Sequence, residues 1–180
     1  RYNNTDVLEK GYAISLRPLS LFAARMYLDE NPLKASERAI SMIMFKLEGQ
    51  LIQRNPDFHM ENRLLLDKID FEKGTVRIGD KEYEMLDSDF PTVDPKDPYR
   101  LTAEEEQVVE RLRHAFVHCE KLQKHVRFLF AKGSMYKIFN SNLLYRGCVP
   151  MDEDGNFEQI NVYGKLCSGK KLYEVLETYA

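Results

Sequence analysis

The spacing of apolar residues changes twice along this chain, and that change limits the folds open to it. Apolar side chains recur every three or four residues from Leu16 to about Arg54, at alternate positions from Lys68 to Met85, and again at helical spacing after Thr102. The first spacing is typical of helices that bury one face, and alternation is typical of strands with one wet face. The sequence therefore predicts an α+β protein.

Two helices are predicted in the first third of the chain. The first has one apolar face and stops at the turn-forming residues 29–32; the face consists of Leu16, Leu19, Phe22, Ala23, Met26 and Tyr27. The second is predicted from about Ser36 to about Arg54, because Pro56 would end it. Its predicted buried face consists of Ile40, Ile43, Met44, Leu47 and Leu51. A further short helix is predicted over 61–67.

The central part of the chain is predicted to form a small antiparallel meander. Residues 68–71, 76–78 and 82–85 alternate apolar and polar side chains, and glycines separate them. Residues 89–100 contain three prolines, each of which lacks a backbone N–H donor. This stretch is therefore predicted to be an extended surface connection.

A capping box opens the second helical stretch. The Thr102 hydroxyl can accept from the N3 amide, and the Glu105 carboxylate can accept from the Thr102 amide. One long helix is predicted from Ala103 to Ala131, where Gly133 would end it. Two short strands are predicted over 135–139 and 143–146, and a last helix over 172–180.

The composition excludes several classes of protein. The 26 Lys and Arg residues against 29 Asp and Glu residues give a net charge of −3, without the basic excess typical of nucleic-acid-binding proteins. No apolar run approaches the roughly 20 residues that cross a bilayer. Cys119, Cys148 and Cys167 form no C-x-x-C pair, which argues against a disulfide framework or a zinc ribbon and favours the reducing cytoplasm. The chain starts at Arg1 and ends in an uncapped helical pattern, so we expect a segment of a longer polypeptide.

Three short motifs suggest ligands, but each has a simpler structural interpretation. Residues Gly164–Lys171 nearly match the phosphate loop G-x-x-x-x-G-K-[ST], with a lysine where the hydroxyl belongs, so a connection before the last helix is favoured. Asp152–Gly155 resembles the start of a calcium loop, but the glycine comes too early and an acidic turn is favoured. His114, His118 and His125 fall on one face of the predicted long helix. The outer two would lie about 16 Å apart, so only His114 and His118 remain a weak candidate for zinc, and a solvated face is favoured.

Longer strings resemble the class III fructose-1,6-bisphosphatases of bacteria. The strings, in order along the chain, are 14–19 (ISLRPL), 45–49 (FKLEG), 63–70 (RLLLDKID), 89–99 (DFPTVDPKDPY), 120–136 (EKLQKHVRFLFAKGSMY) and 142–155 (NLLYRGCVPMDEDG). The resemblance implies a calcineurin-like metallophosphatase fold, in which a β-sandwich flanked by helices carries a two-metal site. It implies hydrolysis of the 1-phosphate of fructose 1,6-bisphosphate in gluconeogenesis, usually with manganese. Residues 1–100 would form an inserted helical and β-hairpin region, and residues 101–180 the long helix with part of the core.

Two departures from the family pattern affect the metal site. The motifs D-x-H, G-D-x-x-D-R-G and G-N-H-[DE], which carry metal ligands in the family, do not occur in these 180 residues. The corresponding family string reads L-L-Y-H-G-C, and its histidine is a metal ligand, whereas Leu143–Cys148 places Arg146 at the histidine position. A guanidinium has no lone pair for a metal, but it can hold a phosphate by two parallel hydrogen bonds.

The substrate-binding candidates are accordingly Arg146 and Lys132. For Lys132 a surface charge at a helix C-terminus is the favoured alternative. The resulting hypothesis is part of a fructose-1,6-bisphosphatase that is inactive alone, with fructose 1,6-bisphosphate and the remainder of the parent chain as partners and a homo-oligomer left open. The alternative is a non-catalytic docking or regulatory module, or part of a degenerate phosphatase. A nucleotide-binding protein is a third, weaker hypothesis.

Overall fold

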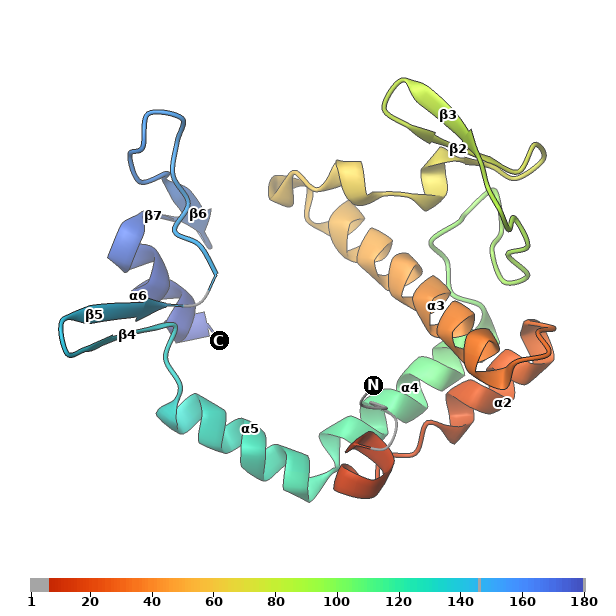
Figure 1. The fold of residues 1–180 in the computed structure, drawn as a ribbon, viewed down its shortest axis with the longest axis horizontal. Helices are drawn as coiled ribbons and strands as arrows, with labels where there is room; N and C mark the ends of the chain where they lie inside the picture. The colour runs from red at the N-terminus through yellow and green to blue at the C-terminus, as the bar shows by residue number, and fades with distance from the viewer. Residues whose placement is uncertain (1–6, 146, 180) are drawn as a thin grey trace. The chain divides into compact units, whose positions relative to one another are not determined.

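A computed structural model describes residues 7–145 and 147–179, and Figure 1 shows their helices and small antiparallel sheets. Contacts divide the chain into two compact units, Arg1–Cys119 and Glu120–Ala180, and each is described by itself. The mixed α and β content agrees with the α+β prediction. Within the described ranges, no helix has the length and apolar character needed to cross a membrane.

The first unit begins with one π-helical turn (Val7–Gly11), followed by helices α2 (Arg17–Met26) and α3 (Pro32–Arg54). Helix α3 starts four residues before the predicted Ser36. Asn31 is its N-cap, and the Asn31 side chain accepts a hydrogen bond from the Leu33 amide at 3.0 Å. Pro32 occupies the first helical position, where its missing N–H costs nothing.

The predicted buried face of α2 is confirmed, but that of α3 is only partly right. Leu19, Phe22, Ala23 and Tyr27 are buried in a cluster that also contains Ala35, Ala39, Ile43 and Val108. The buried residues of α3 are Ala35, Ala39, Met42, Ile43, Lys46, Gly49 and Ile52. Of the five predicted residues, Ile43 is buried and Ile40 packs against the same cluster, whereas Met44, Leu47 and Leu51 are exposed. Small residues, three large apolar residues and a paired lysine therefore line the side of α3 that packs into unit 1.

Three separate 3-10 turns follow α3, over Pro56–Phe58, Glu61–Arg63 and Leu66–Lys68. The single short helix predicted over 61–67 is therefore wrong. The first turn ends at His59, which has a left-handed φ of 51°, and the second ends at Leu64 in a non-helical conformation. Each turn is too short to satisfy an i→i−4 ladder, which explains the 3-10 geometry.

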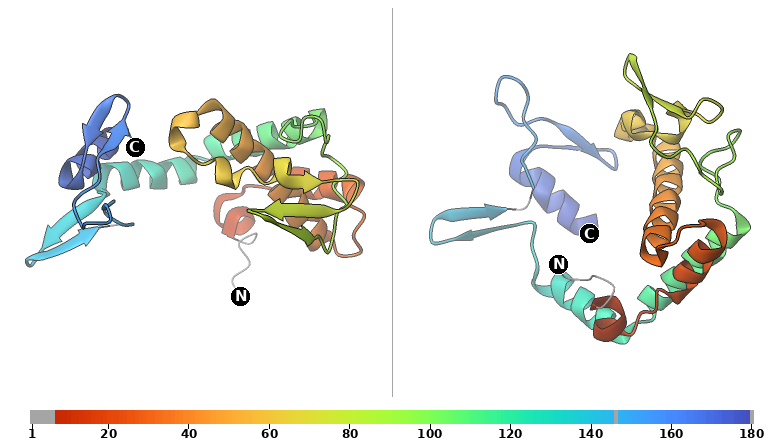
Figure 2. Two further views of the ribbon diagram at one scale, coloured as in Figure 1. Left: turned by 90° about the horizontal axis from the view of Figure 1, so that it is seen from above. Right: turned by 45° about the vertical axis from the view of Figure 1, so that its right-hand side comes forward.

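The predicted meander is confirmed. Strands β1 (Ile69–Asp70), β2 (Thr75–Ile78) and β3 (Lys81–Glu84) pair antiparallel in that order. Figure 2 shows the β2–β3 hairpin in two further orientations. The register places Val76 opposite Ile69 and Tyr83.

The segment from 89 to 100 differs from its prediction, because it is not confined to the surface. The side chains of Thr92 and Tyr99 are buried. Tyr99 packs with Met42 and Leu66 in a second cluster. The prolines make the segment irregular, as expected, but two of its side chains anchor it in the core.

The long helix predicted from Ala103 to Ala131 is wrong as one element, because it is two helices, α4 (Ala103–Val117) and α5 (Glu120–Lys132). The capping box at Thr102 and Glu105 is confirmed. After His118, the Cys119 amide reaches back only to the Phe116 carbonyl, at 3.4 Å, and the Cys119 thiol donates to the Tyr12 carbonyl. Val117, His118 and Cys119 all have weak helix propensity, so this contact is enough to end the ladder. The break coincides with the boundary between the two units.

The second unit contains α5, two β-hairpins and helix α6 (Gly169–Tyr179). The hairpins are β4 (Tyr136–Phe139) with β5 (Asn142–Tyr145), and β6 (Ile160–Val162) with β7 (Lys165–Cys167). Asn140 and Ser141 connect the first pair with positive φ of 47° and 60°, the geometry of a type I′ turn. The small core consists of Val162, Cys167, Leu172 and Val175. The predicted strands and last helix are thus confirmed within the described residues.

Candidate functional site

The predicted substrate loop follows β5, and α6 supports the chain on both sides of it. Arg146 itself lies outside the described residues. Tyr145 pairs with Tyr136 across the hairpin, and both rings pack against Tyr173 of α6, with centroids 6.5 and 6.2 Å away. The hydroxyl of Tyr173 donates to the Cys148 carbonyl at 3.2 Å. One buried side chain therefore contacts the residue before position 146 and the backbone two residues after it.

A cation lies beside this tyrosine cluster. The Lys170 ammonium is 5.9 Å from the centroid of the Tyr136 ring, a cation–π distance. It also pairs with Glu174 one turn further along α6, at 3.4 Å. The hydrogen bond that the Lys170 ammonium donates to Glu174 is the largest cause that raises the pKa of Lys170, and the polar end of the Tyr136 side chain adds to it. Lys170 therefore stays protonated at neutral pH.

Lys132, the other predicted substrate-binding residue, is the exposed last residue of α5. Its side chain makes no hydrogen bond or ion pair with any residue that the structure describes. The neighbouring Gly133 amide donates to the Leu129 carbonyl at 2.6 Å and closes the helix. This position agrees with a surface charge that complements the helix C-terminus.

A cavity of about 400 Å³ lies next to Lys132, lined by Val126, Leu129, Phe130, Gly133, Ser134, Met135 and Glu177. The Glu177 carboxylate accepts from the Ser134 hydroxyl and the Met135 amide, both at 2.6 Å. These hydrogen bonds, led by that from Ser134, lower the pKa of Glu177. A carboxylate among apolar walls repels a phosphate, so this cavity does not suit the sugar phosphate.

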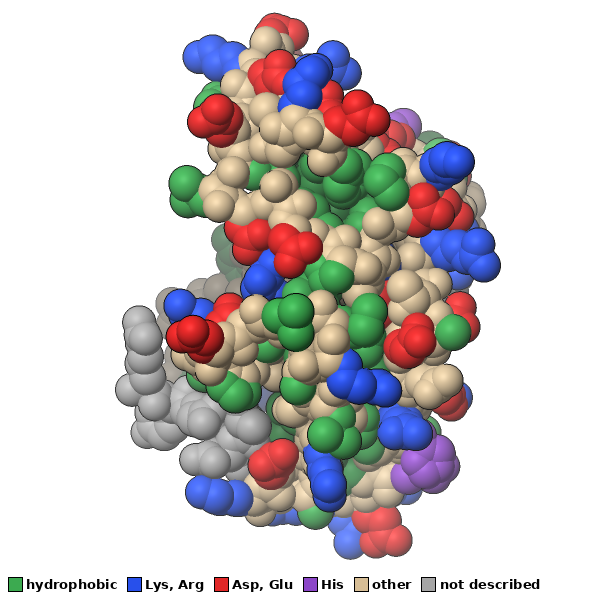
Figure 3. Space-filling view, turned by 90° about the vertical axis from the view of Figure 1, so that its right-hand side faces the viewer, with side chains coloured by type: hydrophobic (Ala, Val, Ile, Leu, Met, Phe, Trp, Pro, Cys, Tyr) green, Lys and Arg blue, Asp and Glu red, His purple; other side chains and the backbone are tan. Residues whose placement is uncertain are grey.

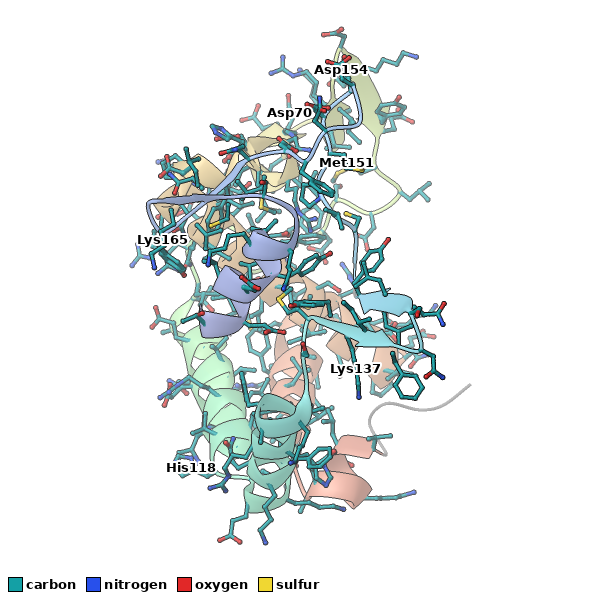
Figure 4. The ribbon with its side chains drawn as sticks, turned by 90° about the vertical axis from the view of Figure 1, so that its left-hand side faces the viewer. Asp70, His118, Lys137, Met151, Asp154 and Lys165 are labelled. Atoms are coloured by element: carbon teal, nitrogen blue, oxygen red, sulfur yellow. The ribbon has the colours of Figure 1, made fainter. Side chains whose placement is uncertain are left out.

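The histidine motif is only partly brought together. The rings of His114 and His118 stack, with centroids 3.9 Å apart and planes at 21°. His118, at the end of α4 (Figure 4), also has its Nδ1 atom 2.9 Å from the His114 carbonyl. His125 lies on α5 in the other unit, so the single three-histidine face predicted for one helix does not form. The pair alone offers at most two ligands.

The other two motifs have the simpler structures. Asp152 accepts hydrogen bonds from the amides of Asp154 and Asn156, at 3.1 and 2.7 Å, which makes residues 152–156 an acidic turn. The bond from Asn156 is the largest cause that lowers the pKa of Asp152. Figure 4 labels Asp154 in this acidic turn and Lys165 at the start of β7. Gly164 lies in the turn between β6 and β7 and Gly169 begins α6, so a strand occupies the place of the phosphate loop.

Sequence reasoning missed a buried polar network in the first unit. Lys46 of α3 and Glu105 of α4 are both fully buried, and the ammonium lies 2.7 Å from the Glu105 Oε2 atom. The same ammonium donates to the Thr92 carbonyl, and Oε2 also accepts from the Thr102 amide at 2.8 Å. The available signal was a lysine on the small-residue face of α3, beside Ala39 and Ile43 in helical spacing.

A tyrosine extends this network to the surface. The Tyr27 and Thr92 hydroxyl oxygens are 3.1 Å apart, and burial is the largest cause that raises the pKa of Tyr27. Arg38 lies over the Tyr27 ring at 5.5 Å and donates to the Asp89 carbonyl. Its guanidinium also pairs with Asp87 at 3.0 Å. All these charges are matched locally, so the network has a structural role.

The residues present do not fit a metal centre. Across residues 7–145 and 147–179, no group of three His, Cys, Asp or Glu side chains converges closely enough to hold an ion. Position 146, where the resemblance implies a ligand histidine, is an arginine, and a guanidinium has no lone pair with which to bind a metal.

Comparisons with known proteins give a consistent result. Residues 1–180 match the family described as Firmicute fructose-1,6-bisphosphatase. The protein named fructose-1,6-bisphosphatase class 3 from Listeria innocua is 46% identical over 197 residues, and the match covers 98% of this chain. Proteins of the same name from Clostridium novyi and Alkaliphilus metalliredigens are 44% and 48% identical, over 100% and 98% of this chain.

The chain spans about 30% of the length of these curated relatives. No solved structure matches it.

Proposed function

Because the chain belongs to the Firmicute fructose-1,6-bisphosphatase family, we propose that it is one part of an enzyme that removes the 1-phosphate of fructose 1,6-bisphosphate. This hydrolysis is a gluconeogenic step, and we place it in the cytoplasm, in keeping with three free cysteines. The observation that carries the proposal is the family match over all 180 residues. The 30% coverage of the relatives supports a role as a segment, with the remainder of the parent chain as its first partner.

The β4–β5 hairpin supports a place in the sheet of a calcineurin-like core. Ile138 and Leu143 pair on one face of the hairpin, and Phe139 and Leu144 lie on the other, all more than half exposed. Strands that are apolar on both faces are typical of sheets covered on both sides. A two-stranded hairpin is also marginal by itself. We therefore infer that further strands and helices of the family-length protein cover it, with residues 1–100 as an inserted region and 101–180 joining the core.

The proposed contribution to chemistry is phosphate binding. Metal-dependent phosphatases use cations to polarise the phosphoryl group and to generate the nucleophile, and manganese is the metal that the resemblance implies. The residues described here do not supply its ligands, as shown above. Arg146 is instead proposed to hold a phosphate oxygen pair by its two-donor edge, with Lys132 adding charge.

The first test is a chimera with a relative of known name. The matching segment of the Listeria innocua protein is replaced by residues 1–180, and phosphate release is measured during a manganese titration. We expect weak activity with Arg146 and, for Arg146→His, a higher rate and tighter apparent metal binding, because imidazole restores a lone pair. The 180-residue chain alone is expected to release no phosphate.

Two controls separate the roles in this test. Arg146→Gln removes the charge without adding a ligand, so it should raise KM without tightening metal binding. Lys132→Gln should raise KM more weakly. An unchanged manganese titration for Arg146→His would disprove the role of position 146, and turnover by the isolated chain would disprove its dependence on the remainder. A folded chimera that stays inactive with either residue would favour the docking or regulatory module.

A further inference from the structure

The loop that carries position 146 is held by a side chain from another element, Tyr173 of α6. Tyr173 is only 7% exposed. Its neighbours Leu172 and Val175 lie in the core of the second unit, so the helix that presents it is itself anchored. Figures 1 and 4 show α6 beside the β4–β5 hairpin, whose first strand carries the labelled Lys137. Tyr173 therefore joins the core of this unit to the end of the hairpin.

Tyr173 contacts the chain before and after position 146. Its ring packs against Tyr145, and its hydroxyl donates to the Cys148 carbonyl at 3.2 Å. Among the residues that the structure describes, the amides of Gly147 and Cys148 make no hydrogen bond of their own. A phenylalanine would fill the same space as the ring, but it could not make the bond to Cys148. The Tyr173 hydroxyl is therefore the polar contact that holds this stretch of backbone.

The backbone at Gly147 gives that contact a purpose. Gly147 has a φ of 80°, which glycine adopts readily and other residues avoid. A Cβ atom there would meet nothing within 4 Å, so the glycine serves the conformation rather than a close approach. Glycine also has more conformational freedom to lose than any other residue. A turn of this kind keeps one direction only if a contact outside it fixes the chain, and the hydrogen bond from Tyr173 to Cys148 is such a contact.

We propose that Tyr173 is a positioning residue, which fixes the loop so that the side chain at position 146 meets its ligand in one geometry. Placement matters because overall charge does not draw a phosphate to this chain. The net charge is −3, and basic and acidic side chains are intermixed on the face that Figure 3 draws. A loop that is already held loses less conformational freedom when a ligand binds. The inference rests on the proposed function, which gives position 146 its role.

The first experiment needs no substrate. Amide relaxation measured by NMR on the 180-residue chain reports the order of the Gly147 and Cys148 backbone. We expect order parameters of about 0.8 in the unchanged chain and below about 0.6 in Tyr173→Phe. Tyr99→Phe is the matched control, because it removes another buried tyrosine hydroxyl, in the first unit, and should leave this loop unchanged. Equal order with and without the Tyr173 hydroxyl, or a loop that is already disordered in the unchanged chain, overturns the proposal.

The second experiment asks whether Tyr173 acts through position 146. Tyr173→Phe is made in the Listeria innocua chimera in three backgrounds: unchanged, Arg146→His and Arg146→Gln. In the unchanged background, we expect the KM for fructose 1,6-bisphosphate to rise about fivefold with little change in kcat, the size of one lost hydrogen bond. With Arg146→His, the apparent manganese affinity should fall by a similar factor. With Arg146→Gln, Tyr173→Phe should have no further effect.

The pattern across the three backgrounds separates positioning from a merely structural role. An equal loss in all three means that Tyr173 acts on the fold alone, and it overturns the proposal. If neither Arg146→His nor Arg146→Gln changes KM or the manganese titration, the proposed role of position 146 fails. The order parameters of Gly147 and Cys148 then still decide whether Tyr173 holds the loop, because they depend on neither substrate nor metal.

Discussion

At the scale of single residues, the strongest constraint in the described structure is the buried ion pair of Lys46 and Glu105. Each partner is fully buried, and the Glu105 Oε1 atom has no hydrogen-bond partner among the residues that the structure describes. Each buried charge has given up its hydration, and only the opposite charge compensates for that loss. Either charge alone is therefore strongly unfavourable in this place. The pair therefore ties α3 to α4 and, through the Thr92 carbonyl, to the segment from 89 to 100.

Removal of one partner should be severe. We expect Lys46→Met to destabilise the chain by about 3–5 kcal/mol, since it leaves the Glu105 carboxylate buried without a counter-charge. Urea unfolding followed by circular dichroism measures the change. Lys46→Met with Glu105→Gln should recover part of the loss, because the amide is neutral and can still cap Thr102. The control Arg113→Met breaks an exposed pair with Glu110 and should change stability little. Equal effects of Lys46→Met and Arg113→Met would contradict the argument.

At the scale of elements, α3 and the irregular segment after β3 are fitted to each other at Gly49. A Cβ atom on Gly49 would overlap the ring of Tyr99. The Tyr99 carbonyl accepts from the Gln50 side chain at 2.7 Å, and the Tyr99 hydroxyl accepts from the Asp67 amide at 3.4 Å. Glycine inside a helix is unfavourable by itself, so here close packing outweighs propensity.

Gly49→Ala should therefore destabilise the chain, although alanine favours a helix more than glycine does. We expect a loss of about 1–3 kcal/mol from overpacking against Tyr99, measured by urea unfolding. Ser41→Ala, at an exposed position of the same helix, should stabilise slightly, as propensity alone predicts. The double variant Gly49→Ala with Tyr99→Leu should lose less than the two single changes together. A stabilising Gly49→Ala would show that the ring moves aside at no cost.

At the scale of the whole molecule, contacts define two units whose boundary falls at Cys119 and Glu120. Helix α4 belongs with the first unit, because Val108 lies in its core and Glu105 pairs with Lys46. The division at residue 100, drawn from the resemblance, describes regions of the parent protein and stays a prediction. The contacts show which residues the first unit needs to be complete.

Two fragments test that requirement. We expect residues 1–119 to unfold cooperatively on heating, because the buried pair and the main cluster are intact. Residues 1–100 should lack a cooperative transition, since Lys46 would lose its partner and the α2–α3 core its cover. Thermal melts at 222 nm measure both. Equal cooperativity of the two fragments would move the boundary to residue 100.

Local features of this chain were readable from the sequence, because neighbouring residues determine them. The capping box at Thr102 needs only Glu105, three residues away, and the β-meander follows from alternation between glycine turns. The family, too, is a property of the sequence, carried by long strings such as 142–155. These features depend on short-range sterics and hydrogen bonds, so they hold before any packing is known.

Only the tertiary structure decided which face of α3 is buried and where the helical stretch after Thr102 breaks. Periodicity favoured Met44, Leu47 and Leu51, but the helix turns Lys46 inward because Glu105, 59 residues later, neutralises it. The break at His118 likewise depends on the contact of Cys119 with the distant Tyr12 carbonyl. Burial of a charge and the end of a helix without proline or glycine are settled by partners far along the chain. Spacing within one segment does not contain that information.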